Sequence, residues 1–93
     1  MLEFKKKENN NNFMFTLLQL KLDKTLKKFN NEYYFTLVEN QNIVVGIGRL
    51  ISFNDHIKYI TEIWLNENYI EYEKDFIKYM TKDDSYTYLQ YNN

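Results

Sequence analysis

The residue types that most often bind transition metals, histidine and cysteine, are almost absent from this chain. Among its 93 residues there is one histidine, His56, and no cysteine. A transition-metal site needs several such ligands, so we expect no metal centre. The sequence Gly46-Ile47-Gly48 is not a dinucleotide-binding fingerprint, because no helix begins there and no third glycine follows. The absence of cysteine also excludes a disulfide framework and is typical of a reducing compartment.

The charged residues are separated along the chain. Residues 1–31 hold seven lysines and three acidic residues, a net charge of +4, whereas residues 62–84 hold seven acidic residues and three lysines, a net charge of −4. Lysines beside aromatic residues can bind nucleic acid, and the lysines in question are Lys5–Lys7, Lys21, Lys24, Lys27 and Lys28. The net charge of the whole chain is −1, so we do not expect nucleic acid as a partner.

The sequence contains no signal for secretion or membrane insertion. The first residues, MLEFKKKENNNN, contain a basic cluster but not the apolar segment of a signal peptide, and no run of roughly 18 apolar residues occurs. We therefore expect a soluble cytoplasmic protein. Aromatic residues make up 18% of the chain and provide the large apolar surfaces that a small core requires.

Residues Tyr33–Asn66 predict a three-stranded antiparallel meander. Three apolar runs, 33–39, 43–53 and 56–66, are separated by polar turns that are too short for a crossover connection. Gly46 and Gly48 interrupt the middle strand, where glycine usually marks a bulge or the close approach of another segment.

The residues before the meander predict a short strand and two helices. Met1–Lys7 is a candidate strand, and Asn9–Asn12 predicts a loop or a helix N-cap. From residue 13 the pattern is ambiguous: Phe13, Leu17 and Leu20 fit a helix, whereas Leu18, Leu20 and Leu22 alternate as in a strand. We predict a helix over residues 13–22, and a second one over residues 24–29 that Asp23 would cap.

The residues after the meander predict one helix and one strand. The helix covers residues 69–82, with Asn68 and Glu71 as a capping box, and its sheet-facing residues are Tyr69, Tyr72, Phe76 and Met80. Residues 85–91 alternate as a strand. Because a strand, a helix and a strand follow one another, the last strand should run parallel to the third strand of the meander. The predicted fold class is α+β with a mixed sheet.

This order of elements resembles the GCN5-related N-acetyltransferase (GNAT) family. The similarity covers about residues 24–91 and is carried by Val45-Gly46-Ile47-Gly48-Arg49-Leu50 in the middle strand and by Phe35–Asn40 in the strand before it. The resemblance implies that residues 1–93 form a single truncated GNAT-like domain, since the family fold continues through another helix and two strands.

The resemblance also implies roles for particular residues. The family binds acetyl-CoA through the backbone at the end of its fourth strand, which corresponds to Trp64, Leu65 and Asn66, and some members place a general base at the position of Glu62. A glycine-containing loop and a helix N-terminus bind the pyrophosphate in the family. The matching residues, 69–75, contain no glycine and carry Glu71, Glu73 and Asp75, whose charges repel an anion. We therefore expect no bound cofactor and assign no catalytic residue.

These features predict a catalytically degenerate, GNAT-like protein-binding module rather than an enzyme. The last predicted strand has no proline or lysine to protect its edge, so it can pair with a partner protein or with a second copy. The expected interaction surface consists of Tyr86, Tyr88, Tyr91, Glu71, Glu73 and Asp75. An inhibitor of a host defence protein, encoded by a phage or mobile element, is one hypothesis for such a module. The alternative is a minimal acetyl-CoA-dependent N-acetyltransferase that uses Glu62.

Overall fold

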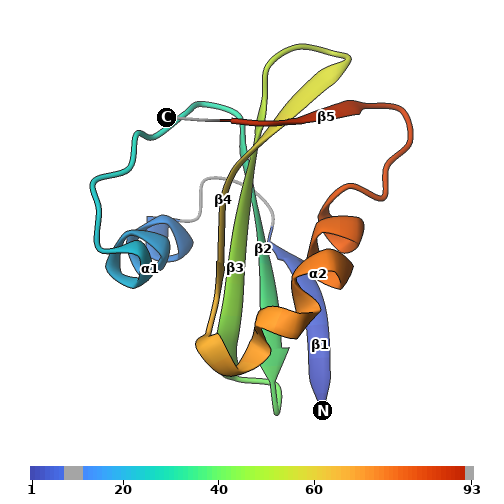
Figure 1. The fold of residues 1–93 in the computed structure, drawn as a ribbon. Helices are drawn as coiled ribbons and strands as arrows, with labels where there is room; N and C mark the ends of the chain where they lie inside the picture. Colours follow the sequence, from blue (N-terminus) through green and yellow to red (C-terminus); the bar gives the residue numbers. More distant parts are fainter. Residues whose placement is uncertain (8–11, 92–93) are drawn as a thin grey trace.

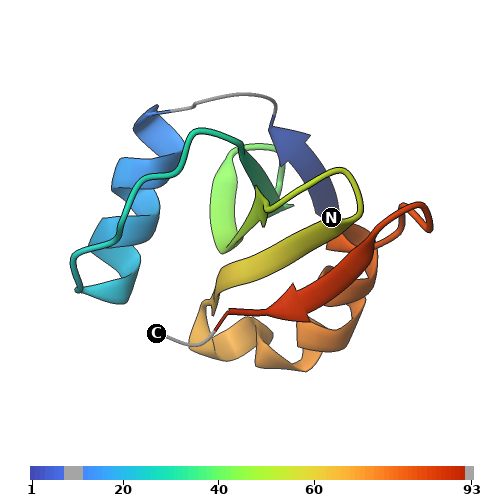
Figure 2. The same ribbon diagram turned by 90° about the horizontal axis from the view of Figure 1, so that it is seen from above.

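The fold is one five-stranded mixed sheet with a helix on each face (Figure 1). The computed structural model describes residues 1–7 and 12–91. In chain order the elements are β1 (Leu2–Lys7), α1 (Asn12–Leu22), β2 (Glu32–Glu39), β3 (Ile43–Ser52), β4 (Ile57–Leu65), the 3₁₀ helix η1 (Glu67–Tyr72), α2 (Glu73–Met80) and β5 (Thr87–Gln90). Figure 2 shows α1 on one side of the sheet and η1 with α2 on the other. No helix in the described part of the chain is long and apolar enough to cross a membrane.

The predicted meander and the parallel last strand are both confirmed. Strands β2, β3 and β4 pair antiparallel, and β5 pairs parallel with β4 from Ile57↔Thr87 to Ile60↔Gln90. The candidate strand at the N-terminus is β1, which pairs antiparallel with β2 and adds a fourth strand to the meander. Asn40 and Gln41 adopt positive φ angles of 53° and 73° in the first turn, a conformation that asparagine tolerates better than most residues.

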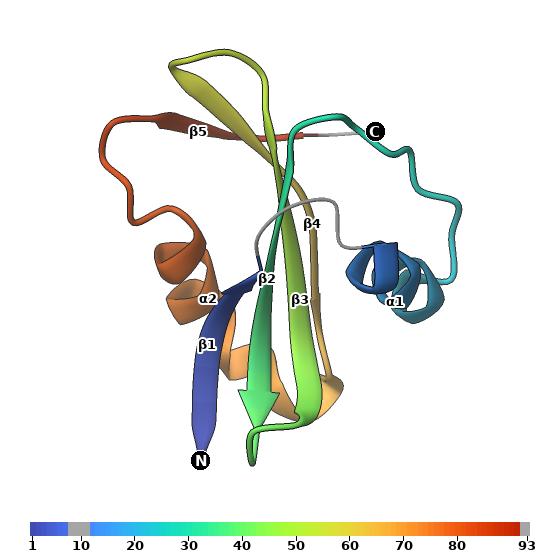
Figure 3. The same ribbon diagram turned by 180° about the vertical axis from the view of Figure 1, so that it is seen from behind.

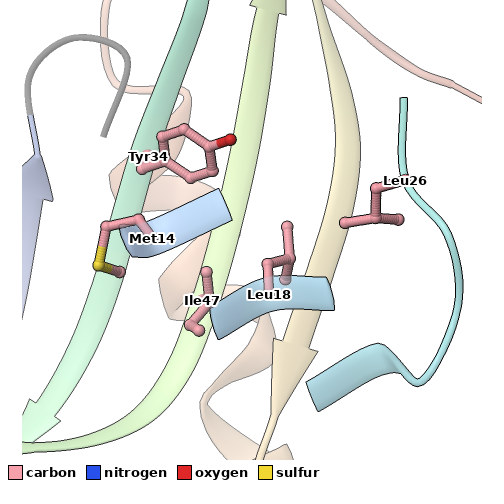
Figure 4. Packing of buried hydrophobic residues seen from close by; sticks show 5 residues of the cluster. All are labelled: Met14, Leu18, Leu26, Tyr34 and Ile47. Atoms are coloured by element: carbon pink, nitrogen blue, oxygen red, sulfur yellow. The ribbon is translucent and has the colours of Figure 1, made fainter. Parts of the chain in front are cut away.

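A helix does form over residues 13–22, but it buries a different face from the predicted one. Met14 and Leu18 are 3% and 0% exposed, whereas Phe13 and Leu20 are 68% and 73% exposed. The helix has apolar residues on both faces, so its sequence pattern alone does not define the buried side. The choice is made by packing, because Met14 and Leu18 lie against Tyr34 and Ile47 of the sheet (Figure 4).

The second predicted helix, over residues 24–29, is wrong. Asp23 does not cap a new helix; it ends α1 with a left-handed φ of 49° and donates its N–H to the carbonyl of Gln19 at 2.9 Å. The following residues form no helix because tertiary contacts hold them: Leu26 is buried in the core and the carbonyl of Lys27 accepts a hydrogen bond from Arg49. Asn12 is the first residue of α1, and the prediction for Asn9–Asn11 lies outside the described residues.

The predicted helix over residues 69–82 is divided into η1 and α2, and its predicted capping box is wrong. Asn68 lies inside η1, and the cap is instead Asn66, whose Oδ1 accepts the N–H of Asn68 at 3.0 Å. Phe76 and Met80 are buried as predicted. Tyr69 and Tyr72 are only partly buried, because a 3₁₀ helix has three residues per turn and does not keep them on the face of Phe76.

The two faces of the sheet carry separate cores. The core under α1 consists of Met14, Leu18, Leu26, Tyr34 and Ile47, which Figure 4 shows converging between the helix and the strands. The core under α2 consists of Phe35, Leu50, Phe76 and Met80. Because strand residues alternate between faces, β2 and β3 contribute to both cores and contain few exposed residues.

Gly46 and Gly48 of β3 allow α2 to lie close to the sheet. A Cβ atom at Gly46 would lie 2.6 Å from Leu65 Cδ2 and 3.2 Å from both Leu37 Cβ and Phe76 Cε2. A Cβ atom at Gly48 would lie 2.5 Å from Sδ and 2.7 Å from Cε of Met80, the flexible end of that side chain, and 3.5 Å from Phe76 Cζ, which is an ordinary contact. The expected close approach at these glycines is therefore confirmed, and β3 also bulges beside Gly46, where the register shifts between Leu37 and Val38.

Replacing Gly46 with alanine should destabilise the protein more than the same change at Gly48. At Gly46 the new methyl group meets, besides the end of Leu65, the Cβ atom of Leu37, which is fixed to the backbone of β2, and the ring of the buried Phe76. We therefore expect a loss of about 1–3 kcal/mol in the free energy of unfolding. At Gly48 the end of Met80 can adopt another rotamer. Urea denaturation of Gly46→Ala and Gly48→Ala measures both values, and an equal or larger loss for Gly48→Ala would contradict this packing.

Candidate functional site

Strands β4 and β5 separate halfway along β4. The ladder between β4 and β5 ends at Ile60↔Gln90. At the same point the pairing of β4 with β3 shifts by one residue, because Leu50 pairs with Ile60 whereas Arg49 pairs with Glu62. Thr61 is the extra residue of this bulge. A bulge bends a strand and ends regular pairing. Among the described residues, the backbone of Thr61–Leu65 therefore has no strand partner on its β5 side.

The side chain of Glu62 is held by a buried arginine. Arg49 is 1% exposed and Glu62 is 7% exposed. Arg49 Nε lies 2.7 Å from Glu62 Oε2, and Arg49 Nη2 donates to Glu62 Oε1 at 3.0 Å. The same guanidinium group lies 3.4 Å from Glu32 Oε1 and donates to Thr61 Oγ1 and to the carbonyl of Lys27, each at 2.9 Å. Glu62 is thus a counter-ion in this structure, and its role as a general base stays a prediction.

The arginine is enclosed by aromatic rings as well as by acids. Its Cζ atom lies 5.4 Å from the ring centroids of both Phe15 and Phe29. Glu32 Oε1 also accepts the backbone N–H of Phe29 at 2.7 Å. We call Arg49, Glu32 and Glu62 the buried ion cluster. It connects α1 and the segment after it to β2, β3 and β4. The sequence pattern did not predict this cluster.

Tyr34 extends the buried ion cluster. Its phenol is fully buried and donates to Glu32 Oε2 at 2.8 Å. Burial and the hydrogen bond to Glu32 raise the pKa of Tyr34 far above its ordinary value, whereas Arg49 nearby lowers it by less. The phenol therefore keeps its proton in the folded protein at pH values where a free tyrosine ionises.

This pKa shift predicts a loss of stability at alkaline pH. In the unfolded chain Tyr34 ionises near its ordinary pKa of about 10, so the unfolded state binds fewer protons than the folded state above that pH. The contribution of Tyr34 is fully present below about pH 10 and is lost as the pH rises through the folded pKa. In urea denaturation at about pH 9 and 11, Tyr34→Phe should lose less stability between the two pH values than the wild type. An equal loss in both proteins would show that Tyr34 is not responsible.

The residues that the resemblance assigns to acetyl-CoA lie at the end of β4 and the start of α2. Trp64 packs on the α1 core and Leu65 on the α2 core. The N–H of Asn66 already donates to the carbonyl of Val45 at 2.8 Å. Four exposed carboxylates lie between residues 67 and 75, against one lysine, Lys74; they are Glu67, Glu71, Glu73 and Asp75.

This arrangement does not fit a pyrophosphate group. Glu73 and Asp75 occupy the first turn of α2, where they neutralise the positive end of the helix dipole. No glycine of η1 or α2 allows the backbone to approach a phosphate closely. The residues present thus favour the helix itself over a bound anion.

The tyrosines and the acids of the expected interaction surface lie apart. Figure 3 shows β5 at one end of β4, and η1 with the start of α2 at the other end. The three tyrosines lie in β5 or next to its ends, and two of them contact nearby segments of the chain. Tyr88 donates its hydroxyl to the carbonyl of Asp83 at 3.0 Å, and the ring of Tyr91 lies edge-on to that of Tyr59, with 6.0 Å between the ring centroids. The six residues therefore form two surfaces, the β5 edge and the acidic start of α2.

A buried lysine lies beside β5. Lys58 is 8% exposed, and its Nζ lies 3.9 Å from the ring centroid of Tyr86 and 4.5 Å from that of Tyr33. Burial, and to a smaller extent the charge of Lys6, lower the pKa of Lys58. The two rings compensate part of the cost of burying the charge through cation–π contacts.

Comparisons with known proteins support the fold. No protein-family model matches the sequence, and no curated protein matches it significantly. Among solved structures, the chain is similar to a GNAT-family acetyltransferase from Streptococcus pneumoniae TIGR4, with a TM-score of 0.75 and 14% identity over 100% of this chain and 76% of that one. It is also similar to a probable acetyltransferase from meticillin-resistant Staphylococcus aureus, with a TM-score of 0.66 and 15% identity over 100% of this chain and 80% of that one.

A third similar structure is a ribosomal-protein-alanine N-acetyltransferase from Brucella melitensis biovar Abortus 2308. Its TM-score is 0.62 and its identity is 11%, over 99% of this chain and 80% of that one. Identities this low show a shared fold and not a shared activity. The strand order, the parallel β4–β5 pair and these three structures lead to one conclusion: the chain has the fold of the GNAT acetyltransferases.

Proposed function

We propose that this chain is a protein-binding module built on the GNAT fold, and that it binds its partner along the outer edge of β5, which has no strand partner among the described residues. The observation that carries the proposal is the chemistry of this edge. Between Ser85 and Tyr91 there is no charged residue and no proline, and natural proteins use charges and proline to prevent pairing at an edge. An unprotected edge strand is suited to the addition of a strand from another protein.

The hydrogen bonds of β5 show which backbone groups are available. Thr87 donates its N–H to the carbonyl of His56, just before β4, at 2.7 Å, and Tyr91 donates its N–H to the carbonyl of Ile60 in β4 at 2.9 Å. Because alternate residues of a strand face the same neighbour, the N–H groups of Tyr88 and Gln90 face away from β4. Leu89 and Tyr91 are 43% and 37% exposed and add apolar surface at this edge.

Two features support binding rather than acetyl transfer. The start of α2 carries carboxylates where a pyrophosphate would lie, and Glu62 is ion-paired with Arg49 inside the protein. A general base must reach the proton that it removes, and a carboxylate held in this way would first have to leave Arg49.

A substitution at Gln90 tests the proposal. Proline there removes an outward N–H and leaves the β4–β5 ladder intact, whereas alanine removes the same side chain and keeps the N–H. The experiment is a pull-down from the source cell or its host. We expect the wild type and Gln90→Ala to capture a partner protein that Gln90→Pro does not capture. Capture by all three proteins, or by none, would contradict binding at this edge.

Pairing with a second copy is the other use of the same edge. An antiparallel pair of β5 strands would place no like charges opposite each other, because the strand is uncharged. Analytical ultracentrifugation separates this case: a dimer that Gln90→Pro dissociates would support self-association at this edge, and a monomer would exclude it. The inhibitory role and the phage or mobile-element origin stay predictions.

Minimal acetyl transfer is the second candidate function, and the bulge at Thr61 is the observation that favours it. It leaves the backbone of Thr61–Leu65 without a partner on the β5 side, among the described residues, and a linear ligand could pair there. This function requires acetyl-CoA to bind, which calorimetry tests directly.

A further inference from the structure

A hollow at the opposite edge of the sheet combines positive charge with apolar walls. It has a volume of about 220 Å³ and lies between β1, β2, the turn before β3 and the first turn of α1. Its lining includes Lys5, Lys7, Thr36, Val38 and Val44. Since pockets for drug-sized ligands are about 300–1,000 Å³, this hollow suits a smaller molecule.

The register of β1 and β2 explains why two lysines face the hollow. Lys5 pairs with Thr36, and Lys7 pairs with Tyr34. Residues directly opposite each other in an antiparallel pair lie on the same face of the sheet. Tyr34 belongs to the α1 core, so both lysines lie on the α1 face. Lys5 also lies 3.6 Å from Glu3, a partly exposed pair that offsets little of this charge.

The floor of the hollow contains a polar atom without a partner. Thr36 is 0% exposed, and its Oγ1 has no hydrogen-bond partner among the described residues. A buried hydroxyl without a partner is costly, and native structures usually satisfy it. Thr36 lines the hollow, but its Oγ1 has almost no exposed surface. A ligand oxygen would therefore accept the hydroxyl proton, and remove this cost, only once the lining side chains shift enough to expose Oγ1.

The remaining walls indicate what else the ligand carries. Phe13 and Met14 of α1 contribute apolar surface together with the two valines, and the first turn of α1 has no acidic side chain to repel an anion. We propose that this hollow binds a small organic carboxylate, with its anionic group between Lys5, Lys7 and Thr36 and its aliphatic part against the valines. This site is separate from the β5 edge and does not depend on the proposed function.

Methyl-detected NMR titration with hexanoate tests the proposal. Hexanoate should shift the methyl signals of Thr36, Val38 and Val44 and saturate at millimolar concentrations. Hexylamine, with the opposite charge, and inorganic phosphate, without an apolar part, should leave these signals unchanged. The proposal is overturned if hexanoate shifts none of them, or if either control ligand shifts them equally.

Three variants identify the binding groups. The double variant Lys5→Gln/Lys7→Gln should weaken hexanoate binding by about tenfold or more, because two charge-assisted contacts are lost. Lys6→Gln is the matched control, since Lys6 lies on the other face, 5.4 Å from the ring centroid of Tyr33. If Lys6→Gln weakens binding as much as the double variant, the site is not the one described.

Thr36→Val separates binding from folding. It removes the partnerless hydroxyl and keeps the shape of the side chain, so the melting temperature should not fall. Hexanoate binding should weaken by about threefold to tenfold, because the ligand loses one hydrogen bond. Unchanged affinity in this folded variant would contradict the role of Thr36.

Discussion

Replacing Arg49 with methionine should lower the free energy of unfolding by about 3–5 kcal/mol, because it leaves two buried carboxylates without their cation. Glu32 and Glu62 are 3% and 7% exposed, so water cannot replace the guanidinium group. Since domains of this size are stable by about 5–15 kcal/mol, the variant should be only marginally folded. Urea denaturation followed by circular dichroism measures the loss.

A triple variant is the control for this prediction. Arg49→Met combined with Glu32→Gln and Glu62→Gln removes the cation and both negative charges, and it should recover part of the lost stability, since neutral amides are less costly to bury than unpaired carboxylates. If the triple variant is less stable than Arg49→Met alone, the cost does not arise from unpaired charge.

Replacing Phe76 with alanine should also lower the free energy of unfolding by about 3–5 kcal/mol. Phe76 is 0% exposed. Its Cε2 atom lies 3.2 Å from the position that a Cβ atom would take at Gly46, and its ring centroid lies 5.6 Å from that of Phe4. Its removal leaves a cavity that glycine residues in β3 cannot fill. The expected result is a large fall in the urea midpoint without a change in the slope of the transition.

Ile70→Ala is the matched control for the loss of Phe76. Ile70 precedes α2 in η1 and is 57% exposed, so its truncation should change stability by no more than about 0.5 kcal/mol. Similar losses in Phe76→Ala and Ile70→Ala would mean that α2 is not attached through its buried face.

The sheet could be predicted because its signals are local. Short polar turns at Glu39–Asn42 and Asn54-Asp55 leave only antiparallel pairing for the strands around them. The parallel pairing of β5 followed from the handedness rule for a strand, helix and strand.

The N-terminal part could not be predicted equally well, because tertiary contacts decide it. The apolar residues of α1 fit two faces, and the sheet selects Met14 and Leu18 over Phe13 and Leu20. Residues 24–29 resemble a capped helix, yet the hydrogen bond from Arg49 to Lys27 and the burial of Leu26 hold them in another conformation. Such contacts join residues that are far apart in the sequence.

The buried ion cluster was missed although the sequence contained a signal for it. Arg49 is the only arginine of the chain and lies within an apolar strand. A charged residue at such a position is almost never fully buried without a partner, so the sequence predicts an acidic partner on a neighbouring strand. Glu32 and Glu62 could not be chosen from the sequence, since the pairing register decides which acids face Arg49.

Isothermal titration calorimetry with acetyl-CoA tests most directly whether this GNAT fold has lost its cofactor site. The acidic, glycine-free start of α2 and the ion pair of Glu62 with Arg49 predict no binding heat at millimolar acetyl-CoA. Saturable binding with a micromolar or lower Kd would contradict the account, and it would make minimal acetyl transfer the better explanation of this chain.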